Sequence, residues 1–243
     1  MKDQETRGVD REQLARRFAE QRARLERAAH GAGRDPASVR LLAVSKTQPP
    51  EALRAAYELG QRDFGENYVQ ELLAKAKTLA DLPELRFHLI GHLQRNKARL
   101  VAGHVHVVQT VDSERLAQEL GQRAASAERA DRLPVLVEVN IGGEPEKSGC
   151  APDELGPLLD AIEQQPALQL RGLMTVPPAT EEAEGARPFF EELRRLRDRH
   201  GGVERLPELS MGMSHDADVA VAAGATWVRI GTALFGPRRP KEP

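Results

Sequence analysis

The sequence predicts a single (β/α)8 barrel, and three observations support this fold. Eight short apolar runs alternate with segments whose apolar residues recur at helical spacing, which is the pattern of βα units on a parallel sheet. Runs such as LPVLVEVNI are too continuously apolar for a strand with one face in water. Eight units of roughly 30 residues also fit the length of about 250 residues that is typical of this barrel.

The eight expected strands are spread over most of the 243 residues. An open, doubly wound sheet is the competing fold, but it needs a glycine-rich turn after its first strand, and here SKTQP follows that strand. We therefore expect one domain over residues 1–243, with the barrel at about 39–236. The expected strands span 39–45, 62–65, 86–91, 105–111, 134–141, 168–176, 208–211 and 226–231.

Helical segments with one apolar side each separate these strands. An additional amphipathic helix, at about residues 10–30 with Leu14, Phe18 and Leu25 on one face, precedes the first strand. Capping residues, prolines and glycines mark where helices begin and end. The expected helices run from Pro50 to Gly60, from Ser113 through Leu120, from Pro152 through Ile162, along Phe189, Leu193 and Leu196, and from Ser214 to Gly224.

Composition excludes several classes of protein. The 37 acidic and 35 basic residues give a net charge of −2, without the basic excess typical of a nucleic-acid surface. No stretch approaches the roughly 18 apolar residues of a membrane helix. The single cysteine, Cys150, cannot form an internal disulfide, and the charged N-terminal segment lacks the apolar stretch of a signal peptide. We expect a cytoplasmic monomer that binds neither nucleic acid nor membranes.

Barrels of this kind place their chemistry at the C-terminal ends of the strands. Lys46 follows the apolar run LLAV of the first strand, so its amine should be partly desolvated, which lowers a lysine pKa. The residue is either a nucleophilic lysine that forms a Schiff base or a solvated lysine at a strand end. Further polar residues follow the other strands: Glu66, Asn67, His92, Asp112, Asn140, Thr175, Ser210, Ser214 and Thr232.

The segments after the seventh and eighth strands, LSMGMSHD and VRIGTALFG, lie where these barrels commonly bind phosphate. Ser214, Gly231 and Thr232 offer hydroxyls and backbone N–H groups there. Each segment alone is equally compatible with a helix cap or a tight turn, and their joint occurrence favours a phosphate site. Arg229 lies deeper on the same side of the eighth strand. Its buried charge needs a partner, which is either a ligand atom or an acidic residue such as Glu138.

Four histidines suggest a metal site, but their spacing does not support one. His88, His92, His104 and His106 have no cysteine or third ligand at a recognisable spacing. We expect no metal, and we expect His88 to be a hydrogen-bonded residue of the barrel or pocket. The sequence also lacks a G-x-S-x-G elbow, a Walker loop and a dinucleotide fingerprint.

Seven segments in chain order resemble the pyridoxal phosphate homeostasis protein family. They are AVSKTQP (43–49), DFGENYVQE (63–71), FHLIGHLQRNK (87–97), VNIGGEPEKSG (139–149), RGLMTV (171–176), LSMGMSHD (209–216) and VRIGTALFG (228–236). The resemblance implies a barrel like the N-terminal domain of alanine racemase, with pyridoxal 5′-phosphate at the strand ends. It implies these cofactor-binding residues: Lys46 in the Schiff base, Ser214, Gly231 and Thr232 on the phosphate, Arg229 near the pyridine nitrogen, Asn67 near the ring, and Met213.

Two positions depart from the family pattern. Gln48 stands where many members have a second lysine, so any role of that lysine in handing over the cofactor does not carry over to this chain. Gly142 precedes Gly143 where many members have a serine, whereas Lys147 is in place.

The implied cofactor site is poorly equipped for catalysis. Arginine stays protonated and cannot supply a proton to the ring nitrogen, so the ring becomes a weaker electron sink. Racemisation also needs a second base opposite the lysine, and neither Tyr57 nor Tyr68 is an obvious candidate. We expect no catalytic residues.

The leading hypothesis is a non-catalytic protein that stores, buffers or delivers pyridoxal phosphate, with apo pyridoxal-phosphate enzymes as transient partners. Two alternatives remain open. One is a small pyridoxal-phosphate enzyme that racemises or eliminates an amino acid. The other is a cofactor-free Schiff-base aldolase acting on a sugar phosphate.

Overall fold

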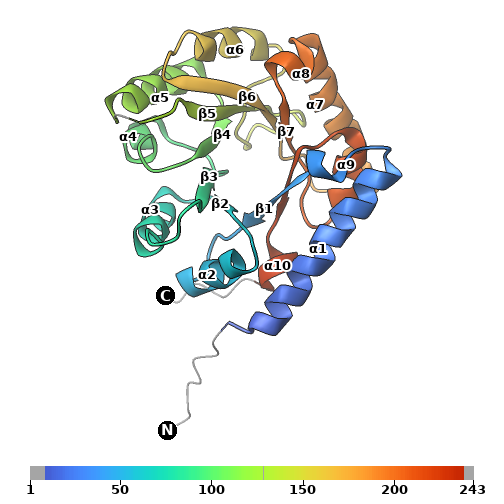
Figure 1. The fold of residues 1–243 in the computed structure, drawn as a ribbon. Helices are drawn as coiled ribbons and strands as arrows, with labels where there is room; N and C mark the ends of the chain where they lie inside the picture. Colours follow the sequence, from blue (N-terminus) through green and yellow to red (C-terminus); the bar gives the residue numbers. More distant parts are fainter. Residues whose placement is uncertain (1–8, 128, 238–243) are drawn as a thin grey trace.

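Eight parallel strands close into a barrel in the computed structural model, which describes residues 9–127 and 129–237 (Figure 1). The strands follow one another around the barrel in chain order, and β8 pairs with β1 from Arg40–Trp227 to Ala43–Ile230. The expected fold is confirmed, and every strand boundary lies within three residues of its expected position. The strands are β1 (Arg40–Val44), β2 (Asp63–Glu66), β3 (Arg86–Leu89), β4 (Val107–Val111), β5 (Leu133–Glu138), β6 (Leu168–Met174), β7 (Glu208–Ser210) and β8 (Trp227–Ile230).

Helices surround the barrel, with at least one in each described connection between strands (Figure 1). The α-helices are α1 (Arg11–Gly31), α2 (Pro50–Glu58), α3 (Val69–Thr78), α4 (Ala98–Val101), α5 (Glu114–Ser126), α6 (Leu155–Glu163), α7 (Arg187–Arg199), α8 (Gly202–Arg205), α9 (Ala217–Ala223) and α10 (Thr232–Phe235). Three short 3-10 helices accompany them: η1 (Pro36–Ser38), η2 (Arg95–Lys97) and η3 (Ala183–Ala186).

The N-terminal helix α1 packs along the outside of the barrel against α9 and α10 (Figure 1). Asp10 caps its start, because the carboxylate accepts a hydrogen bond from the backbone N–H of Gln13 at 2.9 Å. Phe18 is buried on the apolar face and meets Phe235 edge to face, with ring centroids 5.9 Å apart. The helix therefore covers the side of the barrel where the last βα unit ends.

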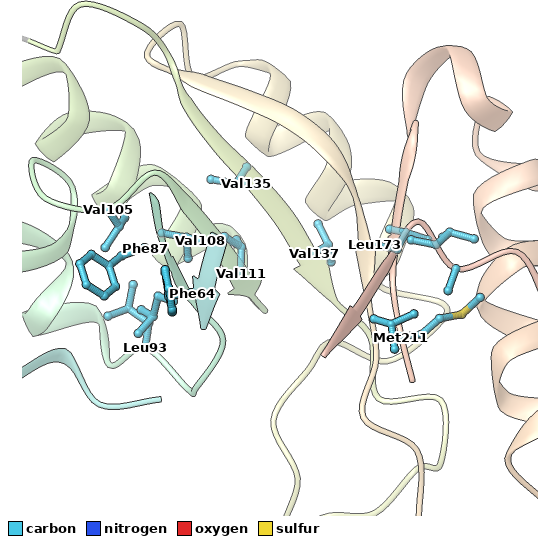
Figure 2. Close-up of a cluster of buried hydrophobic side chains, with 14 of the residues drawn as sticks. Phe64, Phe87, Leu93, Val105, Val108, Val111, Val135, Val137, Leu173 and Met211 are labelled. Atoms are coloured by element: carbon cyan, nitrogen blue, oxygen red, sulfur yellow. The ribbon is translucent and has the colours of Figure 1, made fainter. Parts of the chain in front are cut away.

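Side chains alternate along the strands between two compartments. Those that face the helices form a continuous apolar layer, part of which Figure 2 shows around Phe64, Phe87 and Val108. The barrel interior holds buried side chains outside this layer, such as Leu42 and Trp227. Gly65 makes room there, since an added Cβ would lie 2.9 Å from Ile90 Cδ1.

Some helix details differ from the expectation. Asp216, not Ser214, directly precedes α9, and Ser214 lies in the preceding turn. On α7 the fully buried aromatic residue is Phe190, because it shares a face with Leu193 and Leu196, whereas Phe189 is half-buried. Ser113 does precede α5, but its side chain makes no capping hydrogen bond. No helix in the described part of the chain is long and apolar enough to cross a membrane.

Candidate functional site

A cavity of about 360 Å³ opens at the C-terminal ends of the strands. Its volume lies near the lower end of the range of about 300–1,000 Å³ found for small-molecule sites. The structure brings all seven predicted binding residues together in its wall: Lys46, Asn67, Met213, Ser214, Arg229, Gly231 and Thr232. Sequence reasoning did not assign the remaining lining residues to the site: Val44, Gln48, Ile90, Val176, His215 and Gly236.

Lys46 follows β1 and is half-buried, as its position after an apolar strand predicts. The next residue, Thr47, has a left-handed backbone with φ of 64°, which is costly for a β-branched residue. Its backbone N–H donates to Glu71 Oε1 at 2.5 Å. A contact from α3 therefore fixes the backbone beside Lys46.

A buried ion-pair network contacts the segment that carries Lys46. Lys75 Nζ donates to Glu66 Oε1 at 2.6 Å, to Glu71 Oε1 at 2.7 Å and to the Ser45 carbonyl at 2.7 Å. Burial raises the pKa of Glu66, and Glu71 adds to this, while Lys75 and a hydrogen bond from Ser45 oppose the rise. The sequence analysis did not identify this network. Its available signal is the i,i+4 spacing of Glu71 and Lys75 on one helix.

The loop after β7 is held by two separate contacts. The Met213 backbone N–H donates to Asp216 Oδ1 at 2.6 Å, and Arg24 of α1 donates to the Ser214 carbonyl at 2.7 Å. Gly212 is required here, since its φ is 88° and an added Cβ would lie 2.4 Å from Ala220 Cβ. The N-terminal helix thus fixes the segment that carries Ser214.

The segment after β8 lies close to β1. Gly231 packs tightly against β1, where an added Cβ would lie 3.3 Å from the Val44 carbonyl. Thr232 follows it as the first residue of α10 and lines the cavity. The two segments predicted to bind phosphate therefore line the same cavity.

Arg229 is buried and makes its hydrogen bonds to neutral groups. Its Nη1 donates to Ser210 Oγ at 2.9 Å, and its Nη2 donates to the Thr175 carbonyl at 2.8 Å. Burial lowers the pKa of Arg229 to about 10, against the opposing effect of Glu138 and Asp216. The arginine therefore remains charged at neutral pH.

The alternative partner for Arg229, Glu138, makes no hydrogen-bonded ion pair with it in the described structure. Glu138 Oε2 is buried without a hydrogen-bond partner. Burial and the charge of Asp112 raise the pKa of Glu138 to about 7, although Arg229 opposes this. The charge of Arg229 is thus not neutralised by a contacting carboxylate.

Asn67 presents an unsatisfied polar atom at the cavity. Its Oδ1 is buried and has no hydrogen-bond partner within residues 9–127 and 129–237. The backbone here is tightly packed, since an added Cβ on Gly91 would lie 2.3 Å from the Asn67 carbonyl oxygen. Buried polar atoms usually have partners, so an unpaired one in a cavity wall fits a polar ligand.

Three of the four histidines considered for a metal site contact other residues of the chain. His88 is hydrogen-bonded inside the barrel, as expected, to Asp63 and Gln109 at 3.0 Å each. His92 Nδ1 lies 3.3 Å from Asp112 Oδ2, and His106 Nδ1 accepts from the Phe87 backbone N–H at 3.1 Å. Within residues 9–127 and 129–237, no group of three or more His, Cys, Asp or Glu side chains could hold a metal ion.

Comparison with known proteins identifies the family. The sequence matches the family described as alanine racemase, N-terminal domain, over residues 10–239. A pyridoxal phosphate homeostasis protein of Pseudomonas aeruginosa is 49% identical over 226 residues, which cover 93% of this chain and 96% of that protein. The chain belongs to the pyridoxal phosphate homeostasis protein family. The resemblance drawn from the seven sequence segments is confirmed.

Other known proteins are similar to this chain over nearly their whole length. The Aquifex aeolicus protein is 45% identical over 219 residues, covering 89% of this chain and 94% of that protein. The structure of PipY from Synechococcus elongatus with pyridoxal phosphate bound has 40% identity and a TM-score of 0.79, covering 92% of this chain and 100% of PipY. In the chain described here, Gln48 lies in the cavity wall.

Proposed function

We propose that the protein binds pyridoxal 5′-phosphate in the cavity beside Lys46 and holds it for release rather than for catalysis. The observation that carries the proposal is the joint placement of an amine, two phosphate-compatible segments and a buried arginine around one cavity. The family supports it, since its members are named for pyridoxal phosphate homeostasis and PipY has the cofactor bound. Apo pyridoxal-phosphate enzymes are the proposed recipients.

The residues present fit this cofactor. Pyridoxal phosphate supplies an aldehyde that condenses reversibly with a lysine amine, with loss of water. Lys46 would provide the amine, and Ser214, Gly231 and Thr232 would donate to the phosphate. Arg229 would donate to the ring nitrogen, and the unpaired Oδ1 of Asn67 is available to a donor on the ligand. Met213 would contribute apolar contact.

The same residues argue against efficient turnover. Arg229 can donate a hydrogen bond to the ring nitrogen but holds its own proton too tightly to transfer it. Tyr57 donates its hydroxyl to the Pro83 carbonyl at 2.6 Å and does not line the cavity, and Tyr68 does not line it either. Besides Lys46 and Arg229, His215 is the one titratable side chain in the described lining, and it is exposed. The cavity therefore offers few groups that could move a proton at a bound amino acid.

Borohydride trapping tests the binding half of the proposal. The protein is incubated with pyridoxal phosphate, reduced, digested and mapped by mass spectrometry. We expect the adduct on Lys46 and its loss in Lys46→Ala, with Lys147→Ala as a matched control that keeps it. An adduct on Lys97 or Lys147 in the wild type would contradict the assignment of Lys46.

Hydrogen exchange at Cα tests the non-catalytic half. The loaded protein is incubated in heavy water with L-alanine, L-serine and other L-amino acids, and deuterium incorporation and D-isomer formation are followed. We expect neither at rates approaching the typical enzymatic range of about 1–10³ s⁻¹. Turnover in that range would favour the enzyme alternative. Its loss in His215→Ala would then identify the base.

A further inference from the structure

A line of hydrogen bonds crosses the barrel interior from the cavity to the opposite end. It joins five residues on five strands: Arg229 Nη1 to Ser210 Oγ (2.9 Å), Ser210 Oγ to Gln109 Oε1 (2.6 Å), Gln109 Nε2 to His88 Nδ1 (3.0 Å) and His88 Nε2 to Asp63 Oδ1 (3.0 Å). Gln109 of β4 and Ser210 of β7 lie on strands that are not neighbours in the closed barrel. The hydrogen bond between them must therefore cross the barrel interior.

With Gln109 Oε1 facing Ser210 and its Nε2 facing His88, chemistry fixes the direction of every bond in this line. A guanidinium only donates, so Ser210 Oγ accepts from Arg229 and its own hydrogen goes to the Gln109 carbonyl. The Gln109 amide group must then donate to His88 Nδ1, which is therefore unprotonated. His88 carries its proton on Nε2 and donates it to Asp63.

The far end of the line is a carboxylate. Burial favours the neutral form of Asp63, but hydrogen bonds from Arg86 and His88 outweigh it and hold the pKa of Asp63 well below its usual range. All four bonds therefore point the same way, from a buried cation to an ionised carboxylate. Aligned hydrogen bonds in a low-dielectric interior polarise one another.

This line provides one of the two described hydrogen bonds that orient the Arg229 guanidinium. The other is to the Thr175 carbonyl at 2.8 Å. Gln109 is fully buried and does not line the cavity, so it can act on a ligand only through Ser210 and Arg229. The Gln109 amide is itself held at both ends, which prevents it from rotating.

We propose that Gln109 is a positioning residue that, through Ser210, aims Arg229 at the ring nitrogen of bound pyridoxal phosphate. The inference rests on the proposed function. It adds that selectivity for a ring nitrogen is set inside the barrel, by residues that do not touch the cofactor. His88 and Asp63 serve by fixing the amide orientation of Gln109.

Binding of two ligands tests this inference. Dissociation constants are measured for pyridoxal phosphate and for an analogue in which C–H replaces the ring nitrogen. Both ligands carry the aldehyde and the phosphate, so their affinity ratio reports the contact with the ring nitrogen. We expect the wild type to prefer pyridoxal phosphate, and Gln109→Leu to reduce this preference about three- to tenfold.

Two further variants separate positioning from a general structural role. Thr110→Val alters the next residue of β4, which is also buried and donates to the Gly91 carbonyl at 2.9 Å. It should lower stability without changing the affinity ratio. If Gln109→Leu does not fold, Ser210→Ala breaks the same line, and the same loss of preference is expected.

The outcomes distinguish this inference from the proposed function. An unchanged affinity ratio in Gln109→Leu, or in Ser210→Ala, overturns the inference. A wild type that binds both ligands equally well also overturns it, because Arg229 then does not contact the ring nitrogen. A wild type that binds neither ligand and shows no Lys46 adduct instead contradicts the proposed function.

Discussion

The two ends of the barrel treat buried charge in different ways. At the N-terminal end, Glu208 is buried and accepts from Arg40 at 3.0 Å, from Arg171 at 2.9 Å and from Trp227 Nε1 at 2.9 Å. At the C-terminal end, Arg229 donates to two neutral oxygens, and Asn67 Oδ1 has no hydrogen-bond partner among the described residues. At the N-terminal end, the buried charge is paired within the chain. At the C-terminal end, polar groups in the cavity wall remain available to a ligand.

This difference shows that cavity size alone does not locate the site. A hollow of about 760 Å³ lies at the N-terminal end, compared with about 360 Å³ beside Lys46. The arginines around the larger hollow are largely occupied: Arg40, for example, also lies over the Trp227 ring, 3.8 Å from its centroid. A binding site needs polar groups that the fold has left available, and these are at the smaller cavity.

The strongest test concerns the ion pair beneath Lys46. Lys75→Met leaves the fully buried Glu66 without its cation, so we expect a loss of about 3–5 kcal/mol in the free energy of unfolding. Urea unfolding measures it. The double variant Glu66→Gln/Lys75→Met should recover most of the loss, because it removes the unpaired charge. A single variant as stable as the wild type would show that this pair does not support the loop.

A smaller effect is expected at the opposite end. Glu208→Gln keeps an acceptor for Trp227 but removes the charge that faces Arg40 and Arg171, so we expect a loss of about 1.5–3 kcal/mol at neutral pH. Although burial opposes ionisation, the two arginines and the Trp227 N–H lower the pKa of Glu208. This stabilisation is present above the unfolded pKa of about 4.3 and fades as the pH falls further.

Unfolding of wild type and Glu208→Gln across a pH series measures this effect. The difference in stability should shrink at acid pH, and the affinity for pyridoxal phosphate should not change. A large loss of affinity would contradict the separation of roles between the two ends.

The smallest effect is expected at the cavity wall. Thr232→Val keeps the shape of the side chain and removes a hydroxyl, so we expect the affinity for pyridoxal phosphate to fall about tenfold or more, with little change in stability. Pyridoxal, which lacks the phosphate, is the control ligand and should bind both proteins equally. If the ratio of the two affinities equals that of the wild type, Thr232 does not contact the phosphate.

The sequence alone determined the barrel, the approximate position of each strand and part of the cavity lining. These depend on local information: apolar runs, helical spacing and turn residues report on neighbours along the chain. The C-terminal ends of parallel strands meet at one mouth in this fold, so Lys46, Ser214 and Thr232 could be predicted to lie together.

Only the tertiary structure decided how the buried polar groups pair. Ser210 and Gln109 are 101 residues apart in the chain and meet across the barrel, and Lys75 reaches Glu66 from the neighbouring helix. The sequence left a ligand atom or an acidic residue such as Glu138 open as the partner of Arg229, whereas in the structure Arg229 donates to Ser210 and to the Thr175 carbonyl. Such pairings depend on side-chain directions across non-adjacent strands, which sequence periodicity does not specify.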